Sequence, residues 1–361
     1  MNVKEFVRKE VFELPFYEVE SVTGQNEQVV KLDLNENFAV EGDEVEKLLL
    51  NACQDLDIRA YPPAYGSMAV KALSSFLGFN ESEIAVGNGE DEILDLLMKI
   101  LVKENSLVIT VEPTFTTYTY FAKLYGVRKA TVLLKPNFEL DVDKVLEQAD
   151  RGKALLLICS PNNPTGNQFA REDVEKILQE FRGIVVIDEA YVDFAKYSII
   201  DWVRNFDNLI VLRTFSKAFG LAGIRFGCLI SNKTIVECVK RVTAPFNMNV
   251  VTQRMIVLAL QNWKYFKGRI QEVVKERDWL SQSMAEIDGI APCVSDANFI
   301  LFKITKDDLS SSTITRRLKS RNVLVKDRGD LPLLANCIRV AVGTRQMNQT
   351  FLTTLKKALE E

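Results

Sequence analysis

A lysine flanked by hydroxyl and guanidinium side chains follows an apolar run in the segment RTFSKAFGLAGIRFG (213–227). The amine of Lys217 can attack an aldehyde to form an imine, and partial burial beside cationic groups would lower its pKa towards the reactive neutral form. Thr214, Ser216 and Arg225 offer donors within reach of one phosphate group. The segment therefore predicts imine chemistry beside a phosphate site, and a solvated lysine before a glycine-rich turn is the alternative that it leaves open.

A second set of polar residues follows the apolar run GIVVID (183–188). Asp188 ends this run about one strand plus its crossover connection before Lys217, so both should reach the same sheet edge, where ligands bind in open α/β folds. An ionised Asp188 there could keep a pyridine nitrogen protonated, which makes the ring an electron sink, while Tyr191 donates to a phenolic oxygen. For this segment alone, a helix-capping aspartate beside a packed tyrosine is the alternative.

Two turns add further donors. The prolines and glycine of LLLICSPNNPTGN (155–167) make a stiff turn that presents Asn163 to the same edge. In VGNGEDEILDLLMKIL (86–101), Gly89 precedes an amphipathic helical pattern whose free N–H groups and dipole favour an anion. Glu90 and Asp91 have an alternative explanation as first-turn acids that favour the helix dipole. Each segment is a weak signal alone, and their order along one sheet predicts a common site.

The strands and helices that must position these residues can be predicted from residue 80 to 230, where short apolar runs alternate with helical patterns. This alternation is typical of a doubly wound α/β domain. Near-continuous Val, Ile and Leu in LLLICS, IVVID and LIVLRT indicates strands buried on both faces of a mainly parallel sheet. We expect strands at 84–86, 106–111, 129–134, 154–160, 183–188, 209–214 and 225–231, with helices such as 91–102 and 171–181 between them.

After about residue 250 the pattern changes. Long amphipathic stretches at 251–263 and 265–287 repeat their apolar residues at helical spacing and predict a connecting helix. Strand-like NFILFKI, NVLVK and CIRVAVG then predict a small α+β domain, against which the first 40 or so residues should pack. We expect a large α/β domain at 41–250, and a small domain made of 1–40 and 251–361 that includes the connecting helix.

The composition narrows the class of protein. A net charge of −4, from 45 basic and 49 acidic residues, gives no footprint for nucleic acid or an anionic membrane surface, and no apolar run approaches bilayer length. The absence of histidine excludes Ser-His-Asp triads and histidine-ligated metal sites, and the six cysteines form no C-x-x-C pair. The N-terminus lacks the apolar core of a signal peptide. We expect a cytoplasmic protein that acts on small molecules without a metal ion.

Several motifs resemble a known family. The segments DEAY (188–191), SPNNPTG (160–166) and TFSKAFGLAGIRFG (214–227) resemble the aspartate aminotransferase superfamily of pyridoxal-phosphate enzymes, fold type I, over nearly the whole chain. Within this superfamily, five further segments resemble the histidinol-phosphate aminotransferase branch. They are LDLNEN (32–37), GNGEDE (87–92), APFNMN (244–249), ANFILF (297–302) and CIRVAVGTR (337–345).

This resemblance implies pyridoxal 5'-phosphate (PLP) as the cofactor, bound to Lys217 as a Schiff base. Asp188 would pair with the pyridine nitrogen, and Tyr191 and Asn163 would contact the ring oxygen. Phe115, in EPTFTTY, would stack on the ring face, although an ordinary core phenylalanine is the alternative. The cofactor phosphate would be held by Gly89, Glu90, Asp91, Thr214, Ser216 and Arg225.

The resemblance also implies an assembly and a substrate site. Tyr61, in AYPPAYG, matches a family tyrosine that reaches the phosphate of the neighbouring subunit, which implies a homodimer with shared active sites, although a tyrosine packed in a loop is the alternative. Arg339, Tyr17 and Asn37 match residues that would contact substrate. Lys326 stands where the branch usually has arginine, and lysine cannot make the planar bidentate contact of arginine with a phosphate. Arg328, two residues further on, is a candidate to compensate, and a solvated arginine is the alternative.

The implied reaction is a ping-pong transamination between an amino donor and a keto acid. The expected substrates are histidinol phosphate and 2-oxoglutarate, which would give imidazole-acetol phosphate and glutamate in histidine biosynthesis. Two alternatives share every cofactor residue, namely an aromatic amino-acid aminotransferase and a threonine-phosphate decarboxylase. A catalytically silent ligand-binding relative is a further alternative, against which the intact Lys217, Asp188 and Arg225 argue.

Overall fold

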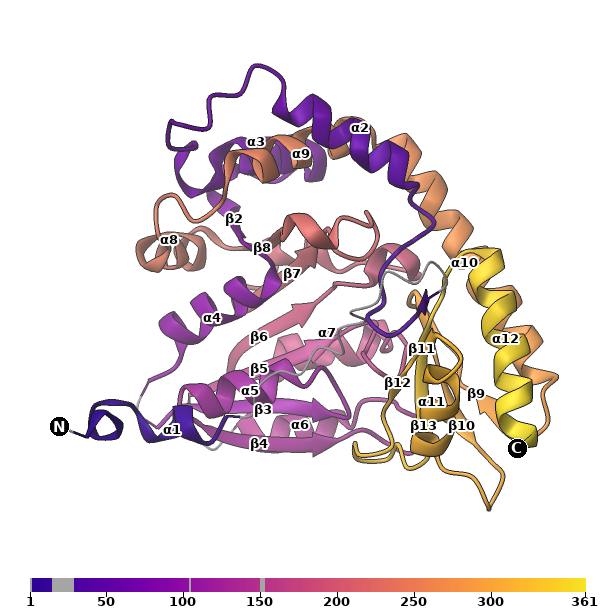
Figure 1. Cartoon of the computed structure of the whole chain (residues 1–361). Helices are drawn as coiled ribbons and strands as arrows, with labels where there is room; N and C mark the ends of the chain where they lie inside the picture. Colours follow the sequence, from indigo (N-terminus) through magenta and orange to yellow (C-terminus); the bar gives the residue numbers. More distant parts are fainter. Residues whose placement is uncertain (1, 15–28, 104, 150–152) are drawn as a thin grey trace.

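A seven-stranded sheet forms the centre of the computed structural model, which describes residues 2–14, 29–103, 105–149 and 153–361 (Figure 1). Its strand order is β2-β8-β7-β6-β5-β3-β4. The strands are β2 (Ile84–Gly87), β3 (Leu107–Glu112), β4 (Arg128–Leu133), β5 (Ala154–Cys159), β6 (Gly183–Asp188), β7 (Leu209–Thr214) and β8 (Gly227–Ser231). Strand β8 runs antiparallel to both of its neighbours, while β7, β6, β5, β3 and β4 pair in parallel. The predicted α/β class with a mainly parallel sheet is confirmed.

The apolar runs in the sequence arise because the sheet is covered on both faces. All six residues of β5 are buried. Its alternate side chains join two different cores, Leu155 and Leu157 one of them, Leu156 and Ile158 the other. Successive side chains of a strand point to opposite faces, so a doubly covered strand must be apolar at every position.

Helices on the two faces supply those cores. They are α2 (Gly42–Cys53), α3 (Ser67–Leu77), α4 (Glu90–Leu101), α5 (Thr117–Leu124), α6 (Val142–Ala149), α7 (Arg171–Glu180), α8 (Lys233–Val242) and α9 (Val250–Gln261). Helix α9 packs against α2 and α3 at one end of the molecule (Figure 1). The large part of the molecule therefore continues past residue 250, and the division of the chain into the two expected domains stays a prediction.

A smaller antiparallel sheet, in the order β12-β13-β10-β9, lies beside the large one (Figure 1). Its strands are β9 (Ile290–Pro292), β10 (Phe299–Ile304), β12 (Lys326–Asp327) and β13 (Cys337–Ala341). The helices of this part are α10 (Trp263–Ala285), α11 (Ser311–Lys319) and α12 (Arg345–Glu360). The expected connecting helix is two helices, since α9 ends before Asn262 and α10 begins after it.

The N-terminal residues divide between the two parts. Strand β1 (Val30–Lys31) pairs in parallel with β11 (Val323–Leu324) of the small part, as expected. The 3-10 helix η1 (Val3–Phe6) and helix α1 (Lys9–Phe12) instead lie towards α5 of the large part, where the Arg8 guanidinium donates to the carbonyl oxygen of Leu124 (Figure 1). The remaining 3-10 helices are η2 (Ala64–Gly66), η3 (Glu81–Glu83), η4 (Val192–Phe194), η5 (Ile200–Arg204) and η6 (Ala222–Ile224). Over the described ranges, no helix is both long and apolar enough to cross a bilayer.

Candidate active site

The carboxyl ends of β5, β6 and β7 meet at one cavity of about 490 Å³. Strand β6 ends at Asp188, and β7 ends three residues before Lys217. The cavity is lined by Glu90, Asp91, Phe115, Asn163, Asp188, Tyr191, Thr214, Ser216, Lys217, Arg225, Lys326 and Arg339, all of which the sequence analysis had singled out. The expectation that these segments converge on one sheet edge therefore agrees with the structure.

Lys217 lies in this cavity with its amine held in place. Its Nζ donates to the carbonyl oxygen of Leu34 at 2.8 Å and lies 5.8 Å from the centroid of the Tyr191 ring. Burial, and next the nearby charge of Arg339, lower the pKa of the Lys217 amine to about 8. With that pKa about a tenth of the amine is neutral at pH 7, against a negligible fraction for an exposed lysine. The lowered pKa therefore increases the fraction of the Lys217 amine that can act as a nucleophile.

Asp188 is buried, at 2% exposure, and hydrogen bonds hold both carboxylate oxygens. Its Oδ1 accepts from the backbone N–H of Ala190 at 2.9 Å, and its Oδ2 accepts from the hydroxyl of Tyr118. Tyr118 was missed in the sequence. Tyr118 is three residues from Phe115 in the chain, and the two rings meet edge to face with their centroids 5.6 Å apart.

Tyr191 is hydrogen-bonded to two asparagine side chains, one of which also contacts Arg339. Its hydroxyl accepts from the side-chain amides of Asn35, at 3.1 Å, and Asn163, at 3.3 Å. Burial raises the pKa of the Tyr191 phenol, so the hydroxyl keeps its proton and remains able to donate. The Oδ1 atom of Asn163 accepts from Nη1 of Arg339 at 2.6 Å. Asn35 is a second residue that the sequence analysis did not select.

The N-terminus of α4 forms the anion-binding corner. Gly89 has φ of +91°, and a Cβ at this position would lie 2.5 Å from Nη2 of Arg225, so glycine lets the guanidinium lie against the helix end. Arg225 donates to Asp91 at 3.2 Å. The Thr214 hydroxyl accepts from the backbone N–H of Ser216 at 3.2 Å and donates to the carbonyl oxygen of Phe226. Free helix N–H groups, a guanidinium and a serine hydroxyl suit a phosphate group.

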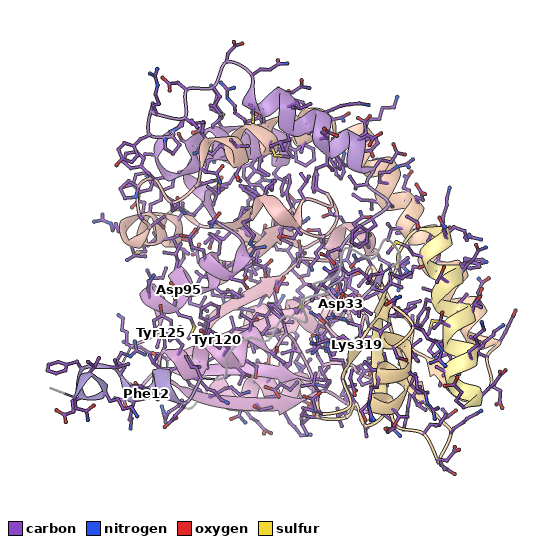
Figure 2. The ribbon with its side chains drawn as sticks, in the orientation of Figure 1. Phe12, Asp33, Asp95, Tyr120, Tyr125 and Lys319 are labelled. Carbon is purple, nitrogen blue, oxygen red and sulfur yellow. The ribbon has the colours of Figure 1, made fainter. Side chains whose placement is uncertain are left out.

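The opposite wall of the cavity carries the residues that were predicted to bind the substrate. Arg339 on β13 is 3% exposed, and its Nη2 donates to the carbonyl oxygen of Asp33. Asp33 lies between the large and small sheets (Figure 2). Lys326 is the register partner of Arg339 across the β12–β13 ladder, and Arg328 lines the same cavity. This wall therefore carries three cationic side chains, and Asp330 of the same segment also lines the cavity.

A larger hollow of about 940 Å³ adjoins the cavity and shares Asp91, Phe115, Thr116 and Asp330 with it. Tyr120 of α5 is part of its lining (Figure 2). Neither Lys217 nor Asp188 lines this hollow. The residues that carry the chemistry therefore line the smaller cavity.

Three predicted residues lie elsewhere. Asn37 is buried outside the cavity, where its side chain donates to the carbonyl oxygen of Ala218 at 2.9 Å and accepts from the N–H of Ala39. It supports the loop that carries Lys217, and Asn35 is the asparagine of that segment that lines the cavity. Tyr61 is 81% exposed and stacks on Phe246, outside the cavity of its own chain. Tyr17 lies outside the described residues.

Fold and site together define a fold type I PLP-dependent enzyme, because the donors, the aspartate and the lysine at one edge of the sheet fit the phosphate, the pyridine nitrogen and the aldehyde of that cofactor. The chain belongs to the aminotransferase class I and II family, whose model matches residues 27–355. Within the described ranges, no cluster of carboxylates and cysteines is suited to a metal ion.

Named relatives sharpen this assignment. The histidinol-phosphate aminotransferase of Clostridium novyi is 32% identical over 356 residues, which covers 98% of this chain and 97% of the relative. That of Pyrococcus furiosus is 34% identical over 332 residues, covering 91% and 92%. The crystal structure of histidinol-phosphate aminotransferase from Sinorhizobium meliloti in complex with PLP has a TM-score of 0.89 at 25% identity, covering 98% of this chain and 97% of that one. The resemblance and the cofactor predicted from the sequence are confirmed.

Proposed function

We propose that this enzyme transfers an amino group from histidinol phosphate to 2-oxoglutarate, giving imidazole-acetol phosphate and glutamate. The observation that carries this proposal is the cationic wall of Arg339 and Lys326, which face the same cavity as Lys217. A transaminase with two substrates must accept both in one site. An arginine fork fits a carboxylate and a phosphate equally well, so one wall serves the anionic groups of both substrates.

The residues around the cofactor divide the work. The bound cofactor supplies an electron sink for the charge that develops at the substrate Cα. Asp188 would hold a proton at the pyridine nitrogen, and Tyr191 and Asn163 would orient the ring oxygen. Phe115 would cover one face of the ring and exclude water from it.

Lys217 carries the proton chemistry. Its neutral amine would take the proton from the substrate Cα and return it to the C4' carbon of the cofactor, as a general base and then a general acid. The lowered pKa, about 8, places the amine near the operating pH, where one group serves both roles. The hydrogen bond to the carbonyl oxygen of Leu34 gives the amine a defined resting position between these transfers.

The experiment that tests the substrate is a comparison of amino donors. The purified enzyme is supplied with 2-oxoglutarate and, separately, histidinol phosphate, phenylalanine or threonine phosphate, and glutamate formation is measured. We expect the highest kcat/KM with histidinol phosphate. Preference for phenylalanine would favour an aromatic aminotransferase, and release of carbon dioxide from threonine phosphate would favour a decarboxylase. Absence of turnover with all three would favour a ligand-binding relative.

We further propose a homodimer that works in the cytoplasm. Tyr61 supports the first part, because an aromatic residue with 81% exposure, stacked on the half-exposed Phe246, is placed to contact another chain. In the dimer Tyr61 would reach the phosphate corner of the partner subunit. The small net charge supports the second part.

A further inference from the structure

The backbone of residues 33–35 is held beside the cavity by three side chains. Three consecutive carbonyl oxygens each accept a hydrogen bond from a different residue. The donors are Arg339 for Asp33, Lys217 for Leu34 at 2.8 Å, and Asn298 for Asn35 at 3.0 Å. Because these donors come from both the large and the small part of the molecule, the position of Asn35 is fixed from both sides of the site.

The side chain of Asn35 is 1% exposed and lines the cavity. Its Nδ2 donates to the hydroxyl of Tyr191 at 3.1 Å. Its Oδ1 is buried and has no hydrogen-bond partner among the described residues. A buried amide that leaves an acceptor unused costs free energy, so the fold gains little from this side chain. The contact with Tyr191 therefore needs an explanation in function.

The hydroxyl of Tyr191 also accepts from a second amide, Nδ2 of Asn163, at 3.3 Å. The orientation of Asn163 is fixed, because its Oδ1 accepts from Arg339 and a guanidinium group is a donor alone. With two amide N–H groups directed at its oxygen, Tyr191 cannot donate to either asparagine. Its own proton is left for an acceptor that enters the cavity, and the two amides polarise the O–H bond and make it a better donor.

We propose that Asn35 is a positioning residue, which keeps the proton of Tyr191 directed at the ring oxygen of the cofactor. This inference rests on the proposed contact between Tyr191 and that oxygen. A donor to the ring oxygen draws negative charge away from it and weakens its attraction for a proton on the neighbouring imine nitrogen. The imine that the cofactor forms with Lys217 therefore loses its proton at lower pH when Asn35 holds Tyr191 in place.

The test is a pH titration of the visible spectrum of the cofactor-loaded enzyme without substrate, between about pH 5 and pH 10. The proteins are wild type, Asn35→Gly, Tyr191→Phe and the double variant. The imine absorbs at different wavelengths with and without its proton, so the midpoint of the change gives its pKa. Glycine removes the amide and adopts the φ of +56° found at Asn35 without strain. The charged and titratable groups that face Lys217 and Tyr191 are the same in all four proteins, namely Glu36, Glu90, Cys159, Asp188, Arg225 and Arg339.

We expect Asn35→Gly to raise the midpoint by about 0.5 to 1 pH unit and Tyr191→Phe to raise it by about one to two units. The double variant should match Tyr191→Phe, because Asn35 acts through the hydroxyl that this variant lacks. Asn35→Ala should give the same shift as Asn35→Gly, which guards against an effect of the backbone freedom of glycine. Asn322→Gly is the matched control and should not move the midpoint, since Asn322 has φ of +59° but an exposed side chain outside the cavity.

Three results would overturn the proposal and leave the proposed roles of Tyr191 and of the substrate intact. A lowered midpoint in Asn35→Gly would mean that Asn35 accepts the Tyr191 proton and withholds it from the cofactor. An unmoved midpoint in Asn35→Gly, with Tyr191→Phe shifted, would mean that Asn35 has no influence. A further shift in the double variant would mean that Asn35 acts without Tyr191. An unmoved midpoint in Tyr191→Phe would instead overturn the proposed role of Tyr191 together with that of Asn35.

Discussion

The hydroxyl group of Tyr118 donates a hydrogen bond to Oδ2 of Asp188, and both residues are almost completely buried, at 1% and 2% exposure. The donor comes from α5 and the acceptor from the end of β6, so the contact joins two elements that meet only in the folded chain. Burial, together with the charge of Asp188, raises the pKa of the Tyr118 phenol well above its usual value. Tyr118 is therefore a permanent donor to the carboxylate that would face the pyridine nitrogen.

Replacement of Tyr118 by phenylalanine should reduce kcat while leaving KM little changed. Loss of a hydrogen bond to a charged group is worth about 1.5 to 3 kcal/mol, which corresponds to a fall in kcat of roughly tenfold to a hundredfold. Tyr120→Phe on the same helix is the control, since Tyr120 is 39% exposed and lines only the adjoining hollow. Equal kinetics for the two variants would show that the Tyr118 contact does not support catalysis.

The rate at which cofactor-free protein binds PLP should rise with pH, with a midpoint at about pH 8, and level off above about pH 9. The neutral amine of Lys217 is the form that attacks the aldehyde, and its pKa is lowered to about 8. An exposed lysine would keep gaining reactivity up to about pH 10. The rate is measured by stopped-flow absorbance, with borohydride reduction and peptide mapping to locate the bond. Label at another lysine, or a rate still rising steeply at pH 9.5, would contradict the assignment.

The charge of Arg339 contributes to the lowered pKa of the Lys217 amine. The midpoint of the pH dependence of the PLP-binding rate should therefore move when Arg339 is replaced. The charge of Arg339 disfavours a second positive charge on Lys217. Arg339→Met should therefore raise the pKa of the amine and shift the midpoint of the binding rate to higher pH. Arg345→Met is a suitable control, because Arg345 pairs with Glu276 on the surface. An unmoved midpoint in Arg339→Met would exclude the charge of Arg339 as a cause of the lowered pKa.

The sequence predicted the sheet and its edge because these depend on local patterns. Continuous apolar runs require a doubly covered sheet, and the polar residues that end such runs must meet at the carboxyl edge. Tyr118 and Asn35 could not be found this way, since their partners lie on other elements. Asn35 has φ of +56°, and this backbone turn lets Asn35 line the cavity while Asn37 is buried against Ala218. The sequence pattern therefore predicts which segment forms the site, whereas tertiary packing decides which asparagine of that segment faces the ligand.

Glu189, next to Asp188 in the DEAY motif, should prove important for stability. It is 2% exposed and pairs with Nε of Arg213 at 2.9 Å, while it also accepts from Ser198 and the N–H of Ile199. Arg213→Met would leave a buried charge without its partner and should cost about 3 to 5 kcal/mol of unfolding free energy. The measurement is urea unfolding of wild type, Arg213→Met and the double variant with Glu189→Gln. The double variant should recover part of the loss, and purely additive losses would argue against the pair.

Lys326 should matter for the phosphate of the substrate more than for turnover itself. Residues opposite each other across a ladder share a face, so Lys326 lies beside Arg339 on the cavity wall. Lys326→Met should lower kcat/KM for histidinol phosphate about tenfold to a hundredfold, as expected for a hydrogen bond to a charged group. Lys326→Arg should retain or raise it, because arginine adds a bidentate contact. Lys303→Met, at an exposed position of β10, should have no effect.

The control for this series is an amino donor without phosphate. If Lys326 recognises the phosphate, turnover of phenylalanine should change little between wild type and Lys326→Met. A parallel loss with both donors would instead assign Lys326 to the fold of the β12–β13 ladder.

If each active site is built from two subunits, two inactive variants should restore activity when they are mixed. Lys217→Ala and Tyr61→Ala should each be nearly inactive as pure proteins. Mixed and allowed to exchange subunits, they should form hybrids in which one site combines an intact Lys217 with an intact Tyr61 from the other chain. Random pairing makes about half of the dimers hybrids with one native site each, so activity should recover to about a quarter of wild type. No recovery, in a mixture shown by mass spectrometry to contain hybrids, would mean that Tyr61 serves its own chain or serves no site at all.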